Sequence, residues 1–148
     1  MKTALIPALI AGATLAFAAQ AQAAEIKVKM LNTGAQGAMV FEPAAVKLKP
    51  GDTVRFLPTT PGHNAETIAS MLPPGATPVK GAMNKEVVFK FDKPGVYGIK
   101  CAPHFSMGMI FVAKVGDGQP NLAAAEAAAA KTPPLAKKRF AAAFAQVK

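Results

Sequence analysis

The dominant feature of this sequence is a series of short segments in which apolar and polar residues alternate. The first begins at Glu25, where Ile26, Val28 and Met30 are apolar and lysines stand between them. A period of two is typical of a β-strand with one buried face. Similar segments follow at 46–49, 53–56, 87–91, 96–101 and 109–115. The pattern therefore predicts a mainly β fold.

Turn-forming residues separate these segments. They occupy 32–34, 50–52, 73–78, 92–95 and 116–118, where Gly, Pro, Asn and Asp are frequent. These residue types favour turns because they tolerate or impose the backbone angles that a turn requires. Short strands punctuated in this way predict a Greek-key β-sandwich or barrel. We expect the sandwich to occupy 24–115.

The end of the chain, 119–148, predicts a helical extension with two α-helices. An alanine-rich run at 121–130 opens with Asn121, a residue type that caps helix N-termini, and Pro133-Pro134 separates it from a second run at 135–147. The second run places its larger apolar residues on one face; they are Ala136, Phe140, Phe144 and Val147. We expect both helices to pack on one side of the sandwich, so that 24–148 forms a single domain. A membrane-surface helix is disfavoured because this apolar stripe is modest.

The N-terminus has the pattern of a secretory signal peptide. A lysine at position 2 precedes an apolar stretch from Ala4 to Ala19, and the small residues Ala21 and Ala23 precede the predicted cleavage point. A membrane anchor would need about 20 apolar residues and no cleavage site. We therefore expect segment 1–23 to be removed before Ala24, and the mature protein to reside in the periplasm without stable membrane association.

The charge of the chain is positive, with 17 basic and 8 acidic residues. Only Lys2 lies in the predicted signal peptide, so the mature chain keeps almost all of this excess. Nucleic-acid binding is set aside because the lysines are spread singly through strand-like segments and the chain is exported. A field of one sign instead accelerates encounter with acidic protein partners.

One short segment gathers residues that bind metal ions. Cys101, His104 and Met109 lie within nine residues, and the other histidine, His63, follows a different predicted strand. Cys101 is the sole cysteine, so no internal disulfide can form. Taken singly, a buried cysteine, a histidine or a methionine usually has a packing role. Together, a thiolate, imidazoles and a thioether are ligands that suit copper cycling between two oxidation states.

Other uses of these residues fit less well. Zinc favours four cysteine and histidine ligands, or three with a water molecule, and no second cysteine or third histidine is present. A thiol enzyme would leave Met109 without a role. A copper storage or delivery protein would expose exchangeable methionine or histidine clusters, and Met107 with Met109 is the one suggestive pair.

The spacing C-x2-H-x4-M, preceded by Gly62-His63-Asn64, resembles that of the cupredoxins, the type 1 copper electron carriers. The resemblance to the pseudoazurins within this family covers essentially the whole mature chain. It is carried by segments 30–32, 37–43, 50–54, 62–68, 94–98 and 101–109. Plastocyanins share the ligand spacing but lack the two terminal helices.

The resemblance implies a site and a function. His63, Cys101 and His104 would hold one type 1 copper ion in a near-trigonal plane, Met109 would be the weak axial ligand, and Asn64 would tie the two ligand loops together. The protein would then be no enzyme but a soluble, monomeric, periplasmic one-electron carrier cycling between Cu(II) and Cu(I). Its partners would be redox proteins such as copper nitrite reductase, nitrous oxide reductase or a cytochrome c.

The resemblance also implies a docking surface. Electrons would pass through the edge of His104, and apolar residues would surround it: Met39, Pro103, Phe105 and Met107. Lys80 and Lys100 would steer partners, whereas Thr33 and Pro61 stand where several relatives have lysine.

Overall fold

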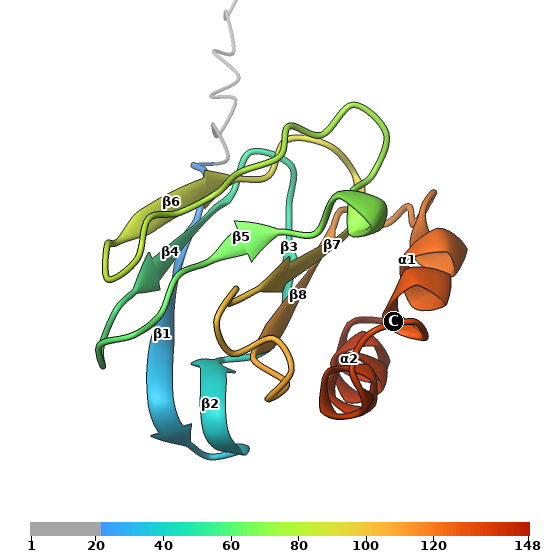
Figure 1. The fold of residues 1–148 in the computed structure, drawn as a ribbon. Helices are drawn as coiled ribbons and strands as arrows, with labels where there is room; N and C mark the ends of the chain where they lie inside the picture. The colour runs from blue at the N-terminus through green and yellow to red at the C-terminus, as the bar shows by residue number, and fades with distance from the viewer. Residues whose placement is uncertain (1–21) are drawn as a thin grey trace, which may run out of the picture.

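A computed structural model describes residues 22–148 of the protein (Figure 1). The predicted signal peptide lies almost entirely outside the described residues. Within them, eight strands form two sheets, and two helices follow. The strands are β1 (Glu25–Gly34), β2 (Gly37–Glu42), β3 (Ala45–Leu48), β4 (Thr53–Leu57), β5 (Glu66–Thr67), β6 (Val87–Lys90), β7 (Gly95–Lys100) and β8 (Ile110–Val115). The helices are α1 (Leu122–Ala129) and α2 (Pro134–Val147), and a short 3₁₀ turn, η1 (Ala69–Met71), follows β5.

The two sheets pack face to face. One has the strand order β2-β1-β4-β6, and the other has the order β3-β8-β7-β5. Both are mixed, because β1 runs parallel to β4 and β3 runs parallel to β8, while the other neighbours are antiparallel. This arrangement confirms the predicted mainly β sandwich with two C-terminal helices.

The core between the sheets is built from the alternating residues of the strands. Val28 and Met30 of β1 point inward and are fully buried, as predicted from the period of two. Phe56 packs edge to face against Phe41 at 5.4 Å and against Phe111 at 5.2 Å between ring centres. Burying each such side chain contributes about 1.5–3 kcal/mol, and the edge-to-face pairs add to this.

A second apolar layer lies between the β3-β8-β7-β5 sheet and the helices (Figure 1). Strand β8 is buried on both faces, since Phe111 points into the sandwich while Ile110 and Val112 face the helices. Phe140 and Phe144 of α2 cover this outer face. The predicted apolar stripe of the second helix is confirmed, because all four of its residues are buried: Ala136, Phe140, Phe144 and Val147.

Two strands were not predicted, and one predicted turn is wrong. Segment 32–34 continues β1 instead of forming a turn, because Thr33 pairs with Ala38 and Gly34 pairs with Gly37. The chain reverses at residues 35–36, between β1 and β2. Strand β2 does not show a clear alternation, and β5 has only two residues, so neither produces a period-two pattern.

Asn121 stands at the N-cap of α1, as predicted, but its side chain does not cap the helix. Its Oδ1 accepts a hydrogen bond from the Val96 N–H (2.9 Å), and its Nδ2 donates to the Val96 carbonyl (2.7 Å). Both groups are buried, so pairing them with the backbone of β7 satisfies them better than a solvent-facing cap would. Asn121 therefore fastens α1 to β7.

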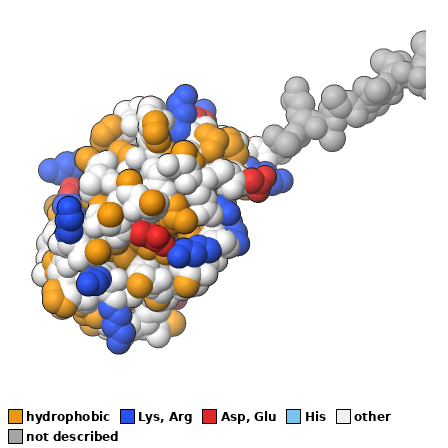
Figure 2. All heavy atoms as spheres, turned by 90° about the vertical axis from the view of Figure 1, so that its right-hand side faces the viewer, with side chains coloured by type: hydrophobic (Ala, Val, Ile, Leu, Met, Phe, Trp, Pro, Cys, Tyr) orange, Lys and Arg blue, Asp and Glu red, His pale blue; other side chains and the backbone are white. Residues whose placement is uncertain are grey.

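The outer face of the helices is shown in Figure 2, where basic side chains are dispersed among apolar ones. Within residues 22–148, no helix combines the length and the apolar character needed to cross a membrane.

Candidate metal centre

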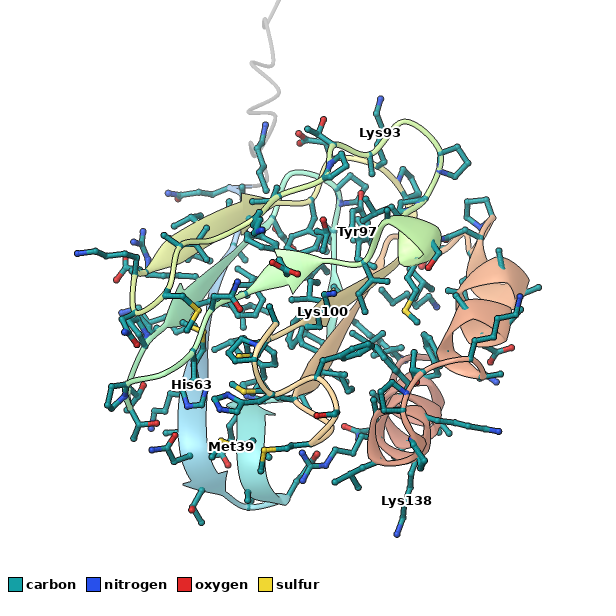
Figure 3. The ribbon with its side chains drawn as sticks, in the orientation of Figure 1. Met39, His63, Lys93, Tyr97, Lys100 and Lys138 are labelled. Carbon is teal, nitrogen blue, oxygen red and sulfur yellow. The ribbon has the colours of Figure 1, made fainter. Side chains whose placement is uncertain are left out.

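The four residues predicted as ligands come from two loops at one end of the sandwich, where Figure 3 labels His63. His63 lies in the loop that follows β4. Cys101 follows directly after β7, His104 lies in the turn that joins β7 to β8, and Met109 directly precedes β8. The antiparallel pairing of β7 with β8 brings the two ends of the second loop together, since the Cys101 N–H donates to the Met109 carbonyl at 3.0 Å.

The donor atoms of three of these residues form a triangle. The His63 Nδ1 and His104 Nδ1 atoms are 3.1 Å apart, and the Cys101 Sγ atom lies 3.8 Å from the first and 3.5 Å from the second. A circle through points with these separations has a radius of about 2.0 Å, close to metal–imidazole and slightly shorter than metal–thiolate bond lengths. A single ion therefore fits near the centre of this triangle.

The chemistry of the donors favours copper over zinc. Two imidazoles and one thiolate suit both metals, but a closed zinc site needs a fourth ligand of the same kinds. Among residues 22–148, no further histidine, cysteine or carboxylate joins His63, Cys101 and His104 in the cluster. His63 and Cys101 are fully buried, so ligand exchange with water is restricted at two of the three positions.

The orientation of His63 is set by the other side of its ring. Its Nε2 lies 2.8 Å from the Asn32 Oδ1 and 3.3 Å from the Thr60 hydroxyl oxygen. An amide oxygen only accepts, so the Nε2 carries the proton and the Nδ1 presents its lone pair to the site. Burial, and then the neighbouring His104, lower the pKa of His63 and so favour this neutral form.

Asn32 and Thr60 were not recognised from the sequence as part of the site. The sequence pattern places Asn32 in a turn, whereas it lies within β1 and its Oδ1 accepts a hydrogen bond from the His63 Nε2–H. Thr60 also holds Asn32 in place, because its hydroxyl oxygen accepts a hydrogen bond from the Asn32 N–H at 2.8 Å. Neither residue has a local signal, because both act through contacts made across the fold.

The pKa of the Cys101 thiol is subject to two opposing influences. Burial raises the pKa of the thiol, while hydrogen bonds from the backbone N–H groups of Asn64 and His104 act in the opposite direction. Such N–H donors stabilise negative charge on the sulfur. The same pocket therefore shields the sulfur from water and supports it as a thiolate when a cation is bound.

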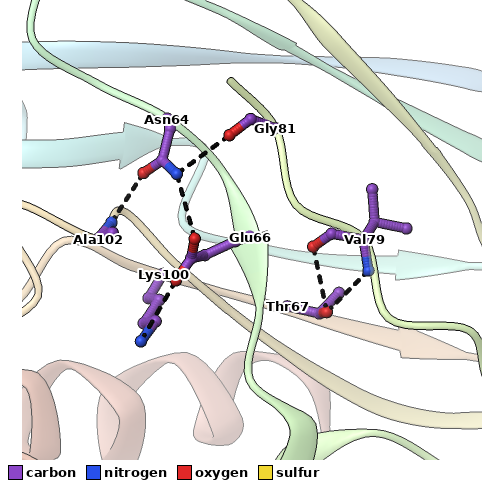
Figure 4. A network of polar contacts seen from close by, with 7 residues as sticks. All are labelled: Asn64, Glu66, Thr67, Val79, Gly81, Lys100 and Ala102. Atoms are coloured by element: carbon purple, nitrogen blue, oxygen red, sulfur yellow. Dashed lines mark hydrogen bonds and ion pairs between the residues drawn. The ribbon is translucent and has the colours of Figure 1, made fainter. Parts of the chain in front are cut away.

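Asn64 connects the two ligand loops, as predicted (Figure 4). Its Oδ1 accepts a hydrogen bond from the Ala102 N–H at 2.8 Å, which ties the His63 loop to the residue after Cys101. Its Nδ2 donates to the Gly81 carbonyl (3.2 Å) and to Glu66 (3.3 Å). The side chain is almost fully buried, so it holds the relative position of the two loops.

The two methionines of the ligand loop differ in burial. Met109 is 0% exposed, and its N–H donates to the His104 carbonyl at 3.1 Å. Met107 is 42% exposed. Met109 therefore belongs to the buried core, at the end of the sandwich that carries the predicted ligands. Met107 belongs to the surface.

The residues predicted to surround His104 differ in exposure. His104, Phe105 and Met39 are half-buried, while Pro103 and Met107 are exposed. Lys80 is exposed as well. Lys100 is more constrained, because its Nζ lies 3.4 Å from a carboxylate oxygen of Glu66 and 5.2 Å from the centre of the Phe105 ring.

Comparisons with known proteins agree with this geometry. The family described as copper binding proteins, plastocyanin/azurin family, matches residues 28–116. A pseudoazurin of Methylorubrum extorquens is 54% identical over 95% of this chain and 96% of its own length. A pseudoazurin of Paracoccus pantotrophus is 47% identical over 95% of each chain.

Solved structures give the same result. The crystal structure of pseudoazurin from Methylobacterium extorquens AM1 superposes with a TM-score of 0.80 at 53% identity, covering 84% of this chain and 99% of that one. Pseudoazurin from Hyphomicrobium denitrificans has a TM-score of 0.76 at 43% identity, covering 84% and 98%. Fold, donor cluster and relatives together show that the chain belongs to the plastocyanin/azurin family of copper-binding electron carriers and is similar to its pseudoazurins.

Proposed function

We propose that the protein is a periplasmic one-electron carrier whose single type 1 copper ion is held by His63, Cys101, His104 and Met109. The donor triangle carries this proposal, because its dimensions fit one ion without rearrangement. Met109 is the fourth member because it is the buried thioether that directly follows the loop.

The bound ion supplies a one-electron couple, and the protein keeps its surroundings nearly constant. The backbone of Cys101 is hydrogen-bonded to Met109, the ring of His63 is hydrogen-bonded to Asn32, and both residues are excluded from water. A site that does not rearrange between oxidation states has a lower barrier to electron transfer. His104 is the histidine that reaches the surface, so its edge is the route by which electrons enter and leave.

Export and the limits of the domain are also part of this proposal. We place the signal peptide at 1–23 and the domain at 24–148. The curated pseudoazurin of Methylorubrum extorquens aligns over 95% of this chain, whereas the solved M. extorquens pseudoazurin aligns over 84% of it and 99% of its own length. This difference supports removal of a leader. By family resemblance, the partners are periplasmic copper nitrite reductase, nitrous oxide reductase or a cytochrome c.

Copper storage or delivery is the second candidate function, and burial argues against it. The pair that suggested an exchangeable site, Met107 and Met109, is split by the fold, since Met109 is fully buried. A carrier retains copper against a chelator and is reduced rapidly and reversibly. A storage protein would release copper to the same chelator.

The assignment of the axial ligand predicts a contrast between the two methionines. Met109→Gln should change the visible spectrum of the copper(II) protein and lower its reduction potential, because an amide oxygen is a harder ligand that favours Cu(II). Met107→Leu should leave both nearly unchanged, since Met107 is a surface residue. Spectroscopy and voltammetry of the two variants measure this contrast. The opposite pattern would make Met107 the axial ligand.

The docking surface predicts a salt-dependent effect of its lysines. Lys80→Glu should slow electron transfer to copper nitrite reductase at low ionic strength and have little effect at high ionic strength, because salt screens charges beyond about 8 Å at physiological ionic strength. Lys100→Glu should have a smaller effect, since Glu66 already offsets the charge of Lys100. Stopped-flow kinetics across a salt series measure both variants.

An apolar change on the same surface should behave differently. Met39→Lys should slow transfer at every salt concentration, because it spoils close approach to the His104 edge. Lys138→Glu on helix α2 is the control, because Figure 3 shows this side chain directed away from the site. The proposed docking surface is wrong if the Lys80 variant is silent at low salt while the Lys138 variant slows transfer.

A further inference from the structure

Arg139 of α2 makes an unusual set of contacts with the ligand end of the sandwich. Its Nη1 donates to the carbonyls of Met39 (2.9 Å), Gly108 (3.0 Å) and Met107 (3.3 Å). Its Nη2 donates to the carbonyls of Ala38 (3.0 Å) and Gln36 (3.2 Å). One side chain therefore joins α2, the β1–β2 hairpin and the loop that carries Cys101, His104 and Met109.

Gly108 makes room for the Arg139 side chain, and Gly37 lies next to it. Gly108 has φ +80°, and a Cβ built there would lie 2.9 Å from the Arg139 Cδ, closer than Cβ contacts in proteins come. Gly37 has φ +103°, and a Cβ there would lie 3.6 Å from the Arg139 Nη2. The backbones of both segments thus approach the arginine closely, which a side chain at position 108 would prevent.

The hydrogen-bond partners of Arg139 are backbone carbonyls, which are neutral acceptors. Within residues 22–148, no carboxylate forms an ion pair with Arg139, although other lysine and arginine side chains do form such pairs. A guanidinium presents several N–H donors in a rigid planar fork, which suits several acceptors at fixed positions. Partial burial strengthens these hydrogen bonds and makes the loss of the donor costly for the carbonyls that face it.

We propose that Arg139 is a positioning residue of the redox site. It locks the His104–Met109 segment of the ligand loop to the hairpin that carries Met39, on the two sides of the surface through which electrons pass. This inference rests on the proposed function, since it assigns Arg139 to the rigidity that a copper carrier needs. The residues that bind copper are held from within by Asn64 and Asn32, whereas Arg139 holds the outer half of the loop from the helical layer.

The proposal predicts that replacing Arg139 changes the rates of electron exchange and copper loss more than it changes the stability of the fold. Arg139→Gln should keep the copper(II) blue band but lower the electron self-exchange rate and shorten the half-life of copper against a chelator, each by about tenfold, equal to about 1.4 kcal/mol of barrier. Arg139→Lys keeps the charge but not the fork, so it should recover only part of the loss. Line broadening in NMR spectra of mixed oxidation states measures the self-exchange rate.

Two matched variants separate positioning from general stability. Lys138→Gln changes the neighbouring, exposed residue of the same helix and should match the parent in both measurements. Phe144→Leu lowers the stability of the second apolar layer, of which Phe144 is a buried member, and leaves the hydrogen bonds of Arg139 in place. It should unfold at a lower temperature while exchanging electrons at the parental rate. If Phe144→Leu slows exchange as much as Arg139→Gln, Arg139 has only a structural role and the proposal is overturned.

The remaining outcomes are also decisive. A folded Arg139→Gln protein with the parental exchange rate and copper half-life contradicts the proposal. If Arg139→Gln does not fold, the comparison is made with Arg139→Lys, for which parental values likewise contradict it. A parent protein that takes up no copper or does not exchange electrons contradicts the proposed function instead, so the two failures are distinguishable.

Discussion

Replacing Cys101 with serine is expected to abolish the intense blue absorption of the copper(II)-loaded protein. That absorption arises from charge transfer between a thiolate and copper, and Cys101 is the sole cysteine of the chain. The sulfur stands at one corner of the donor triangle, 3.5 Å and 3.8 Å from the two imidazole nitrogens. A serine hydroxyl is a harder, weaker ligand for Cu(I), so the affinity for the reduced ion should fall as well.

The substitution is a sharp test because it changes little else. Serine is similar to cysteine in shape, so the buried space at position 101 can hold it. Circular dichroism should therefore match the parent, and absorption titration with copper(II) should show no blue band. Met107→Leu is the control, since it alters the same loop outside the donor triangle. A blue band that persists in the Cys101 variant would remove the thiolate from the site.

Deleting the helices after Gly118 is expected to destabilise the protein severely while leaving every predicted copper ligand in the chain. The deletion uncovers the outer face of the β3-β8-β7-β5 sheet, where several buried side chains lose their cover: Met71, Val96, Ile110 and Val112. Exposing them costs on the order of 5 kcal/mol. The whole stability of a domain is typically about 5–15 kcal/mol. The unfolding temperature should therefore fall by at least about 15 °C, or cooperative unfolding should be lost.

A point substitution gives a graded version of the same experiment. Phe140→Ala should cost about 3–5 kcal/mol, because the ring is fully buried against the sheet. Lys138→Ala, on the exposed side of α2, should stay within about 0.5 kcal/mol of the parent. Thermal and urea unfolding measure the stability of the parent, the two point variants and the truncated protein. A truncated protein as stable as the parent would show that the tail is an independent appendage.

Much of the fold could be predicted because its signals are local. The period-two pattern of β1 and β6 follows from burial of one sheet face, and the apolar stripe of α2 follows from burial of one helix face. The donor cluster could be predicted because Cys101 and His104 are close in sequence and His63 is the only other histidine, while Met109 stays a predicted ligand. The types and spacing of these four residues are enough to narrow the chemistry to a soft metal ion.

Other features depend on partners that are distant in sequence. Segment 32–34, predicted as a turn, is part of β1 because it pairs with β2. The side chain of Asn121, predicted to cap a helix, instead bonds to the backbone of Val96. Arg139 has no signal at all, since its acceptors are more than thirty residues away along the chain and are backbone atoms. Hydrogen bonds of this kind leave no residue-type pattern that a sequence could reveal.

The strand order has a consequence for how copies of this protein behave when crowded. In the described residues, β2 and β6 border one sheet, and β3 and β5 border the other. An open strand edge can add a strand from another molecule and so begin aggregation. β5 is too short to do so, having only two residues, and β6 has only four and ends in Lys90.

The other two borders, β2 and β3, are obstructed by the C-terminal segment. Met39 interrupts the extended backbone of β2 with φ 50°, and Arg139 occupies the carbonyls of Ala38 and Met39. β3 lies against α2, and its Lys47 ammonium group donates to the Lys148 carbonyl at 3.0 Å. Within residues 22–148, no border strand is both long and unobstructed. An electron carrier meets its partners in repeated brief collisions. Among the described strands, such a collision has no open edge on which two molecules could pair their strands and stay associated.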